Sequence, residues 1–146
     1  MFGAINSSAS GLTAERLRMD TIADNLANAN TTRTEDGGPY MRKVVQLEPR
    51  REQLNNFPSF ARHFKPQTIA GRGVRAVGIV EAEGDPRRKF DPDHPDANED
   101  GHLLMPNVDP IKEMVDMMTA TRAYQANVTA IESAKTMFNS ALDIAT

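Results

Sequence analysis

Two segments with heptad-spaced apolar residues stand at opposite ends of this 146-residue chain, and they constrain its fold more than any other feature. In the first segment the rows are uneven, because Ser8 and Glu15 interrupt one of them. The seam consists of Ile5, Leu12, Met19 and Leu26, with Ile22 and Ala29 on the adjoining row. Such spacing is typical of a helix that packs along one face. We predict a helix from about residue 4 to residue 30, ended by the asparagines near residues 28–30.

The second segment begins at residue 109 and carries the clearest pattern in the chain. Asp109 suits an N-cap, and Pro110 suits the first helical position. Seam residues then follow by threes and fours, with Met118 and Ala134 widening the row: Met114, Met117, Thr121, Tyr124, Val128, Ile131, Lys135, Phe138 and Leu142. Thr121 and Lys135 are its polar members. We predict a helix that runs from here to the end of the chain.

Both helices need packing partners, since isolated helices are marginal in water. Only 39% of the residues are hydrophobic and 5% aromatic, which is thin for a self-sufficient core. We therefore expect the helices to pair with each other and to bury the rest of their seams against neighbouring subunits. The predicted subunit-interface residues are Ile5, Leu12, Met19, Ile22, Leu26, Met114, Met117, Tyr124, Val128, Ile131, Phe138 and Leu142.

The middle of the chain is irregular. Residues 36–39 (Asp-Gly-Gly-Pro) predict a turn, and residues 41–47 and 74–81 predict strands. Prolines and glycines between them predict a long variable loop over residues 48–73, and five prolines exclude a long helix from residues 84–110. The predicted fold is mainly α with a small β or irregular middle. The terminal helices, residues 1–32 and 108–146, form one coiled-coil-like domain, and residues 33–107 form an outer segment that contains a β-hairpin.

Composition excludes several classes of protein. The net charge is −3, with basic residues in excess over residues 33–90 and only acids over residues 91–109, which suits docking between like subunits. The basic residues are scattered and few aromatics lie among them, so nucleic acid is a poor partner. There is no cysteine, no transmembrane run and no cleavable signal. This favours the cytoplasm, unless export uses an uncleaved signal.

No catalytic or cofactor motif is present, and we predict neither an enzyme nor a cofactor. His63, His94 and His102 are interpreted as solvated loop residues. Residues 71–73 (Gly-Arg-Gly) lack the third glycine of a phosphate loop. Residues 96–101 resemble the opening of a calcium loop, but the twelfth position is Asn107 where a bidentate glutamate is required. We favour a polar turn between two short strands over a metal site.

Two further clusters have a plain and a sharper interpretation. Residues 87–89 (Arg-Arg-Lys) are interpreted as solvated surface rather than as a docking face for an acidic neighbour. The methionines at 114, 117 and 118 are interpreted as core packing, although flexible Met side chains also suit an interface with non-identical neighbours.

The two ends of the chain resemble the signature of bacterial flagellar axial proteins, the superfamily of rod and hook subunits. The N-terminal motif residues are Ser10, Gly11, Leu12, Asn25, Ala27, Asn28, Asn30 and Thr31, and the C-terminal ones are Arg122, Tyr124 and Asn127. Residues 33–40 (Arg-Thr-Glu-Asp-Gly-Gly-Pro-Tyr) are similar to the variant of the FlgC family of proximal-rod proteins, as are residues 94–98, 105–108 and 113–118. The resemblance is weakest over residues 48–73, and Asp24 stands where relatives often have Asn.

The resemblance implies a structural subunit of the proximal rod of the flagellar basal body. It implies export by the flagellar type III apparatus without a cleaved signal, assembly in the periplasm, and terminal helices that form an inner tube of a torque-transmitting shaft. The implied partners are other copies, other proximal-rod proteins, the rod–ring junction protein and the distal rod. Two alternatives from other classes stay open: a soluble helical adaptor or export chaperone, and a calcium-dependent enzyme or binding module.

Overall fold

The computed structural model describes residues 2–35, 37–50 and 73–145. A long helix lies at each end of the chain, and two small antiparallel strand pairs lie between them in sequence. This confirms the predicted fold class. The elements are α1 (Phe2–Ala27), β1 (Lys43–Pro49), β2 (Val74–Glu81), β3 (Arg87–Phe90), β4 (His102–Met105) and α2 (Pro110–Ala145). Most of the predicted loop, residues 51–72, lies outside the described residues, and residues 48 and 49 belong to β1 rather than to that loop.

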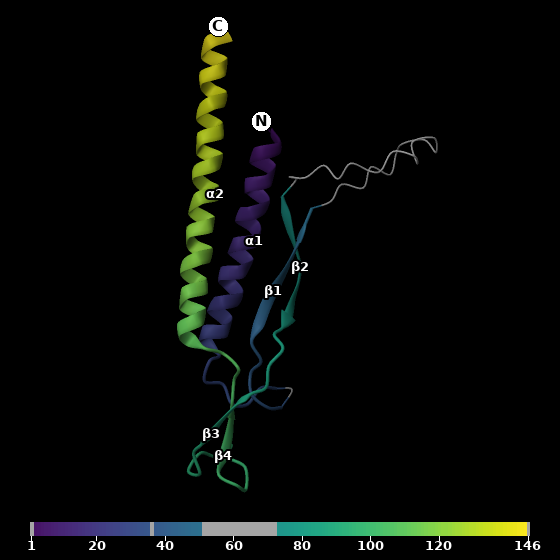
Figure 1. The fold of residues 1–146 in the computed structure, drawn as a ribbon, viewed down its shortest axis with the longest axis vertical. Coiled ribbons are helices and arrows are strands. Elements are labelled where there is room, and N and C mark those ends of the chain that lie inside the picture. The colour runs from purple at the N-terminus through teal and green to yellow at the C-terminus, as the bar shows by residue number, and fades with distance from the viewer. Residues whose placement is uncertain (1, 36, 51–72, 146) are drawn as a thin grey trace, which may run out of the picture.

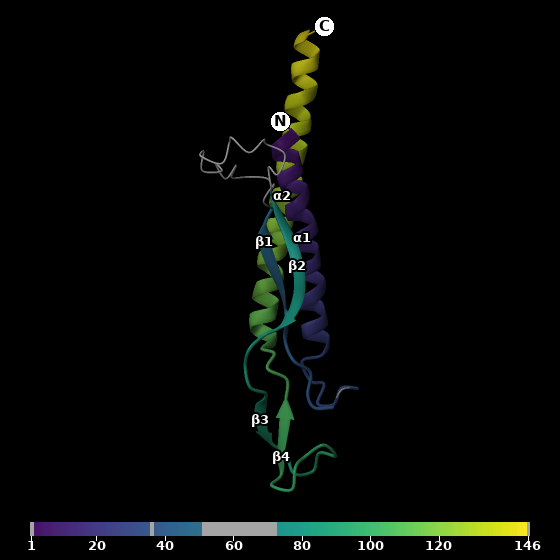
Figure 2. The same cartoon turned by 90° about the vertical axis from the view of Figure 1, so that its right-hand side faces the viewer.

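The helices run antiparallel, side by side (Figure 1). Asn25 near the end of α1 bonds Glu113 near the start of α2, whereas Gly11 faces Asn127 farther along. At the other end α2 continues past the first turn of α1 (Figures 1 and 2). We call the end where Asn25 meets Glu113 the closed end of the helix pair, and the end where α2 extends beyond α1 the open end.

Small side chains bring the two helices close together. Ala14, Ala120 and Ala134 are buried, and a Cβ added at Gly11 would stand 2.9 Å from Nδ2 of Asn127. The Thr121 hydroxyl lies 3.6 Å from Sδ of Met19. Beside these small residues Ile22 is buried, whereas many of the larger apolar side chains, among them Met114 and Phe138, are exposed.

The buried face of α1 is rotated about the helix axis from the heptad row of Ile5, Leu12, Met19 and Leu26. The most buried positions are Ala14, Thr21, Ile22 and Asn25, and Leu26 is exposed. Polar Thr21 and Asn25 can be buried because each side chain is hydrogen-bonded, Thr21 to the Leu17 carbonyl at 2.9 Å and Asn25 to Lys43 and Glu113.

Both helix boundaries follow from local hydrogen bonding. α1 ends at Ala27 rather than residue 30, because the Asn28 side chain bonds the Asp24 carbonyl at 2.9 Å and accepts the Thr31 hydroxyl at 3.2 Å. At the start of α2, Asp109 Oδ1 accepts the Ile111 amide at 3.0 Å, which confirms the predicted N-cap with Pro110 as the first helical residue.

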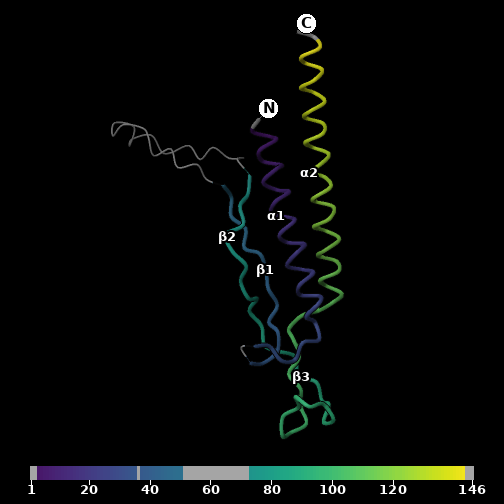
Figure 3. Tube along the Cα trace, turned by 180° about the vertical axis from the view of Figure 1, so that it is seen from behind, coloured from purple at the N-terminus to yellow at the C-terminus, as the bar shows by residue number. Residues whose placement is uncertain are grey.

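Strands β1 and β2 form a two-stranded ribbon that runs along α1 (Figures 1 and 3). Lys43 pairs with Glu81 and Pro49 with Val74, with a bulge between Gln46 and Leu47. Both predicted strands exist, but β1 begins two residues later than expected. The backbone of Arg42 is held instead by the Asn107 side chain, at 2.7 Å from its amide.

Strands β3 and β4 form a hairpin beyond the closed end of the helix pair (Figure 2). Residues 96–101 form the predicted polar turn between these strands, with Gly101 at a φ of 74°. The Thr32 hydroxyl donates to Asp96 at 2.8 Å and ties the hairpin to the segment after α1. The described residues contain no group of three or more His, Asp or Glu side chains that could hold a metal ion.

Two other side-chain interpretations from the sequence are wrong: that of His102 as a loop residue, and that of the methionines as core packing, since Met114 and Met118 are exposed. His102 is not a loop residue: it lies in β4 and packs edge-to-face on Phe90, with ring centroids 5.5 Å apart. Residues 87–89 are exposed, as predicted, and strand pairing also brings the Arg87 guanidinium to the Val108 carbonyl at 2.6 Å. His94 lies in the loop as expected, and His63 is outside the described residues.

Among the residues described, no helix is long and apolar enough to cross a membrane. The apolar core is thin and concentrated near the closed end, where Ala29, Tyr40 and Val108 cluster. Large apolar residues remain exposed on both helices and on the ribbon. The apolar core therefore stabilises the closed end of the molecule. Much apolar surface of the helices and the ribbon stays exposed.

The close helix contact at Gly11 makes a prediction about stability. Alanine favours helices over glycine by about 1 kcal/mol, so Gly3→Ala, with nothing within 4 Å of the new Cβ, should be neutral or stabilising. Gly11→Ala gains the same propensity but must displace Asn127, whose amide is held by the Ala123 carbonyl at 3.0 Å. We expect it to lie about 1–3 kcal/mol below Gly3→Ala in urea unfolding. Equal stabilities of the two variants would contradict close packing here.

Candidate functional site

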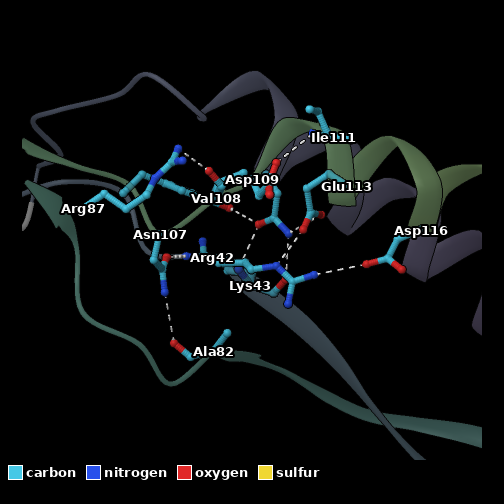
Figure 4. Close-up of polar contacts among 12 residues, drawn as sticks. Arg42, Lys43, Ala82, Arg87, Asn107, Val108, Asp109, Ile111, Glu113 and Asp116 are labelled. Atoms are coloured by element: carbon cyan, nitrogen blue, oxygen red, sulfur yellow. Dashed lines mark hydrogen bonds and ion pairs between the residues drawn. The ribbon is translucent and has the colours of Figure 1, made fainter. Parts of the chain in front are cut away.

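A polar junction joins three parts of the chain at the closed end of the helix pair. It consists of Asn25 from α1, the segment from Tyr40 to Lys43, and the segment from Asn107 to Asp116 that enters α2. Figure 4 shows Arg42 bound to Glu113 and Asp116, with the side chain of Asn107 at its backbone. Because the three parts are distant in sequence, their hydrogen bonds fix how the helices and the ribbon are arranged.

Glu113 and Arg42 form the centre of the junction. Glu113 is completely buried, and its Oε1 accepts a hydrogen bond from Nε of Arg42 at 2.6 Å. The other end of the guanidinium bonds Asp116 at 3.3 Å, one turn farther along α2. A buried carboxylate is costly unless it is paired and hydrogen-bonded. Here the arginine and Asn25 supply donors to both carboxylate oxygens.

Asn25 uses both ends of its side-chain amide. Nδ2 donates to the Lys43 carbonyl at 2.8 Å and to Glu113 Oε2 at 3.1 Å. Oδ1 accepts the Lys43 amide at 2.8 Å and the Tyr40 hydroxyl at 3.1 Å. A single buried asparagine therefore holds α1, the start of β1 and the start of α2 together.

Asn107 and Arg87 hold the segment that leads into α2. Asn107 Oδ1 accepts the Arg42 amide, and its Nδ2 donates to the Gly84 carbonyl at 3.4 Å. Arg87 donates to the Pro106 carbonyl at 3.3 Å and to the Val108 carbonyl. These contacts position Val108 and Asp109, so α2 begins at a fixed place.

The chemistry of the junction is structural. Its carboxylates and guanidinium are engaged with one another, and a nucleophile with an adjacent base is not among the described residues of the junction. A groove of about 270 Å³ opens beside it, lined by Arg18, Ile22, Leu47 and Asp116 among others. Burial and the negative charges of Asp24, Glu113 and Glu81 raise the pKa of Tyr40 above its ordinary value.

The residues predicted to contact other subunits fall into three groups. Ile22 is buried inside the chain. The half-buried residues lie along the helix pair: Ile5, Leu12, Met19, Met117, Tyr124, Val128 and Ile131. The exposed ones lie on the outside or at the open end: Leu26, Met114, Phe138 and Leu142. Contact with another subunit stays a prediction for all of them, and the exposed group has the most surface to offer.

The motif residues also divide by position. Several have a contact inside the chain: Ser10 with Val74, Gly11 with Asn127, Asn25 with the junction, and Asn28 with Thr31. Ala27, Asn30 and Arg122 are exposed. Leu12 and Tyr124 are half-buried. The motif residues with internal contacts are explained by the fold of one chain. The exposed ones, Ala27, Asn30 and Arg122, are accessible to a neighbouring subunit.

The sequence does not reveal the junction. Tyr40, Arg42, Asn107 and Glu113 carry no pattern that ties them together, because their partners are 15 to 88 residues away. One signal was present: Glu113 and Asp116 lie among apolar residues in the first turns of a heptad-patterned segment. A carboxylate at such a position suggests a buried cation partner.

The junction predicts an asymmetric response to mutation. Arg42→Met leaves the Glu113 carboxylate buried without its cation, and breaking such a pair from one side costs about 3–5 kcal/mol. Arg75→Met removes an exposed pair with Glu48 and should cost less than about 1 kcal/mol. Chemical denaturation of both variants measures the difference. Similar costs for the two would show that the junction pair is not essential.

Tyr40 gives a test by pH. The chain has two tyrosines, so Tyr124→Phe leaves Tyr40 as the sole phenol. Its folded pKa is raised, so the ultraviolet titration should have its midpoint above 10 in the folded protein and near 10 in denaturant. The folded state holds this proton more tightly, so the stability from this group is present below pH 10 and lost as pH rises through the folded pKa. A folded midpoint at or below 10 would contradict the burial.

Comparison with known proteins points to one family. Residues 5–33 match the family described as Flagella basal body rod protein, and residues 99–144 match Flagellar basal body rod FlgEFG protein C-terminal. These ranges cover most of α1 and α2, together with the approach to the junction.

Relatives match over almost the whole chain. The flagellar basal-body rod protein FlgC of Borreliella burgdorferi is 44% identical over 99% of this chain and 97% of its own length. That of Bacillus subtilis is 43% identical over 98% and 97%, and that of Aquifex aeolicus is 38% identical over 94% and 92%. The chain therefore belongs to the FlgC family of flagellar basal-body rod proteins.

Proposed function

We propose that this chain is a structural subunit of the flagellar rod that joins its neighbours through its terminal helices, chiefly through two exposed apolar faces of α2. The observation that carries the proposal is the location of these faces in a chain whose relatives are named as rod proteins. The names of the relatives give no support to a helical adaptor or an export chaperone. The exposed faces occur at both ends of the helix pair.

The first face lies on the junction half of α2. Ile111, Met114, Val115 and Met118 are between 48% and 71% exposed, and their spacing by threes and fours places them along one stripe. Leu26 at the end of α1 adds to the exposed apolar surface of this half. Monomeric soluble proteins rarely leave such contiguous apolar stripes uncovered. Methionine also adapts to neighbours of differing shape.

The second face lies at the open end of the pair. Met137, Phe138 and Leu142 are exposed on the part of α2 nearest the C-terminus (Figure 1). A protein with separate apolar faces at its two ends is suited to head-to-tail contact. Contacts of this kind that do not close into a ring build a helical filament.

The junction supports the mechanical side of the proposal. A shaft that transmits torque needs subunits that resist twisting. Long contacts between helices, together with fixed angles between the helices and the ribbon, provide that resistance. The buried bonds of Glu113, Arg42 and Asn25 fix those angles at the closed end. In this arrangement residues 1–32 and 108–146 act as the inner domain, and residues 33–107 act as the outer segment.

Family resemblance suggests the setting. We infer that the chain is exported by the flagellar type III apparatus without a cleaved signal and assembles in the periplasmic part of the basal body. Its neighbours would be further copies, other proximal-rod proteins, the rod–ring junction protein and the distal rod. The role is structural and non-enzymatic, in agreement with a junction whose charged groups are engaged with one another.

Charged substitutions on the exposed faces test this function. Met118→Asp and Phe138→Asp place a charge where a neighbour's apolar surface should lie, so each should leave helix content unchanged and abolish rod incorporation. Removing residues 140–146, or changing Ile131 to Asp, should likewise leave a soluble protein that does not enter the rod. The measurement is swimming together with co-purification of the chain with basal bodies.

Ser140→Asp is the matched control, because it adds the same charge at an exposed polar position of the same helix. It should retain more incorporation than Phe138→Asp. Normal swimming by Met118→Asp and Phe138→Asp variants would refute assembly through these faces.

A further inference from the structure

Ser10 connects α1 to the end of the β1–β2 ribbon that lies away from the junction. Its hydroxyl donates to the Ser7 carbonyl at 2.7 Å and accepts the Val74 amide at 3.0 Å. Val74 is the first residue of β2 and pairs with Pro49, the last residue of β1. One serine hydroxyl therefore satisfies a backbone donor at the outer end of the ribbon.

Gly73 makes this contact possible for two separate reasons. Its φ of 93° lies in the region that favours glycine. A Cβ at this position would also overlap the Ser10 hydroxyl and would stand 3.2 Å from Cα of Ser7. Gly37 has a similar φ of 83° but has nothing within 4 Å, so it shows the first constraint without the second.

The opposite end of the ribbon is also attached to α1. The side chain of Asn25 binds both the amide and the carbonyl of Lys43, the first residue of β1. Ser10 and Asn25 are separated by about 22 Å along the helix at ~1.5 Å per residue. Figure 3 shows the ribbon running beside α1. Two attachments at this separation oppose pivoting of the ribbon, whereas one would permit it.

We propose that Ser10 and Gly73 form a positioning site that fixes the outer end of the ribbon on α1, so that the ribbon and the helix pair move as one rigid body. A two-stranded ribbon is only marginally stable by itself, so its rigidity must come from such attachments. The inference rests on the proposed function in one respect: a rigid ribbon matters because the subunit carries load.

Amide hydrogen exchange measured by NMR on the full chain tests the site directly. Ser10→Ala removes the acceptor of the Val74 amide, which should then exchange about tenfold faster. The Lys43 amide, bound by Asn25 at the other end, should keep its rate. Thr13→Ala is the control, because the Thr13 hydroxyl makes a similar bond within α1, to Ala9 at 3.1 Å, that does not involve the ribbon.

The Val74 rate in Ser10→Ala decides the outcome. An unchanged rate, or an equal acceleration of Lys43 and Val74, would overturn the proposal. In the first case Ser10 does not hold the strand, and in the second the ribbon has no separate outer attachment.

Glycine variants give a second, independent test. Gly73→Ala and Gly37→Ala share the backbone strain, but only the first also meets Ser10. We expect Gly73→Ala to lower Tm more than Gly37→Ala does, and the excess to shrink when Ser10 is also changed to Ala. An excess that is unchanged in the double variant would overturn the contact between Ser10 and Gly73.

Neither measurement requires a rod. An unchanged Val74 amide in Ser10→Ala would therefore overturn this inference and leave the proposed function standing. Conversely, a chain with both attachments intact that never enters a basal body would overturn the proposed function alone.

Discussion

The buried ion pair between Glu113 and Arg42 is the interaction on which the arrangement of this molecule depends. Removing the Glu113 carboxylate from water is unfavourable, and hydrogen bonds from Arg42 and Asn25 compensate for this cost. These two donors come from two other parts of the chain. Well-packed apolar residues of similar size often stabilise a fold as much as such a pair does. The pair is therefore better explained by the geometry that it specifies: its bonds are satisfied in only one placement of α1, β1 and α2.

Small residues inside the helix pair and large ones outside have one physical cause. Gly11, Ala14, Ala120 and Ala134 let the helices approach closely, but they bury little apolar area per residue. The larger residues, among them Ile111 and Phe138, remain in contact with water. A single chain thus has a well-fixed geometry but an incomplete apolar core. Packing against neighbours would bury the remainder, which is the balance expected of a subunit whose stability is shared with its assembly.

The sequence predicted the elements whose signals are local. Heptad spacing gave both helices, Asp109 and Pro110 gave the start of α2, and β-branched residues gave β2. It failed where the deciding contact is distant. Leu26 was expected to be buried, but the polar neighbour Asn25 is buried instead and Leu26 is exposed. Asn25 can be buried because it hydrogen-bonds Lys43 and Glu113. Arg87 is exposed as predicted, but its bonds to the Pro106 and Val108 carbonyls were not foreseen, because these residues become neighbours only when β3 and β4 pair. Nothing in a periodic pattern reports such partners.

The motif residues carry two kinds of constraint, and the fold separates them. Ser10, Gly11 and Asn25 are explained within one chain: the first holds the ribbon, the second admits Asn127, and the third joins the junction. All three serve the same end, since each fixes another element on α1. Arg122 and Asn30 are exposed and have no such explanation within the part of the chain that the structure describes. A subunit that is rigid because of the first set can present the second set at defined positions. In the proposed function, the internal hydrogen bonds therefore hold the exposed motif residues where neighbouring subunits can contact them.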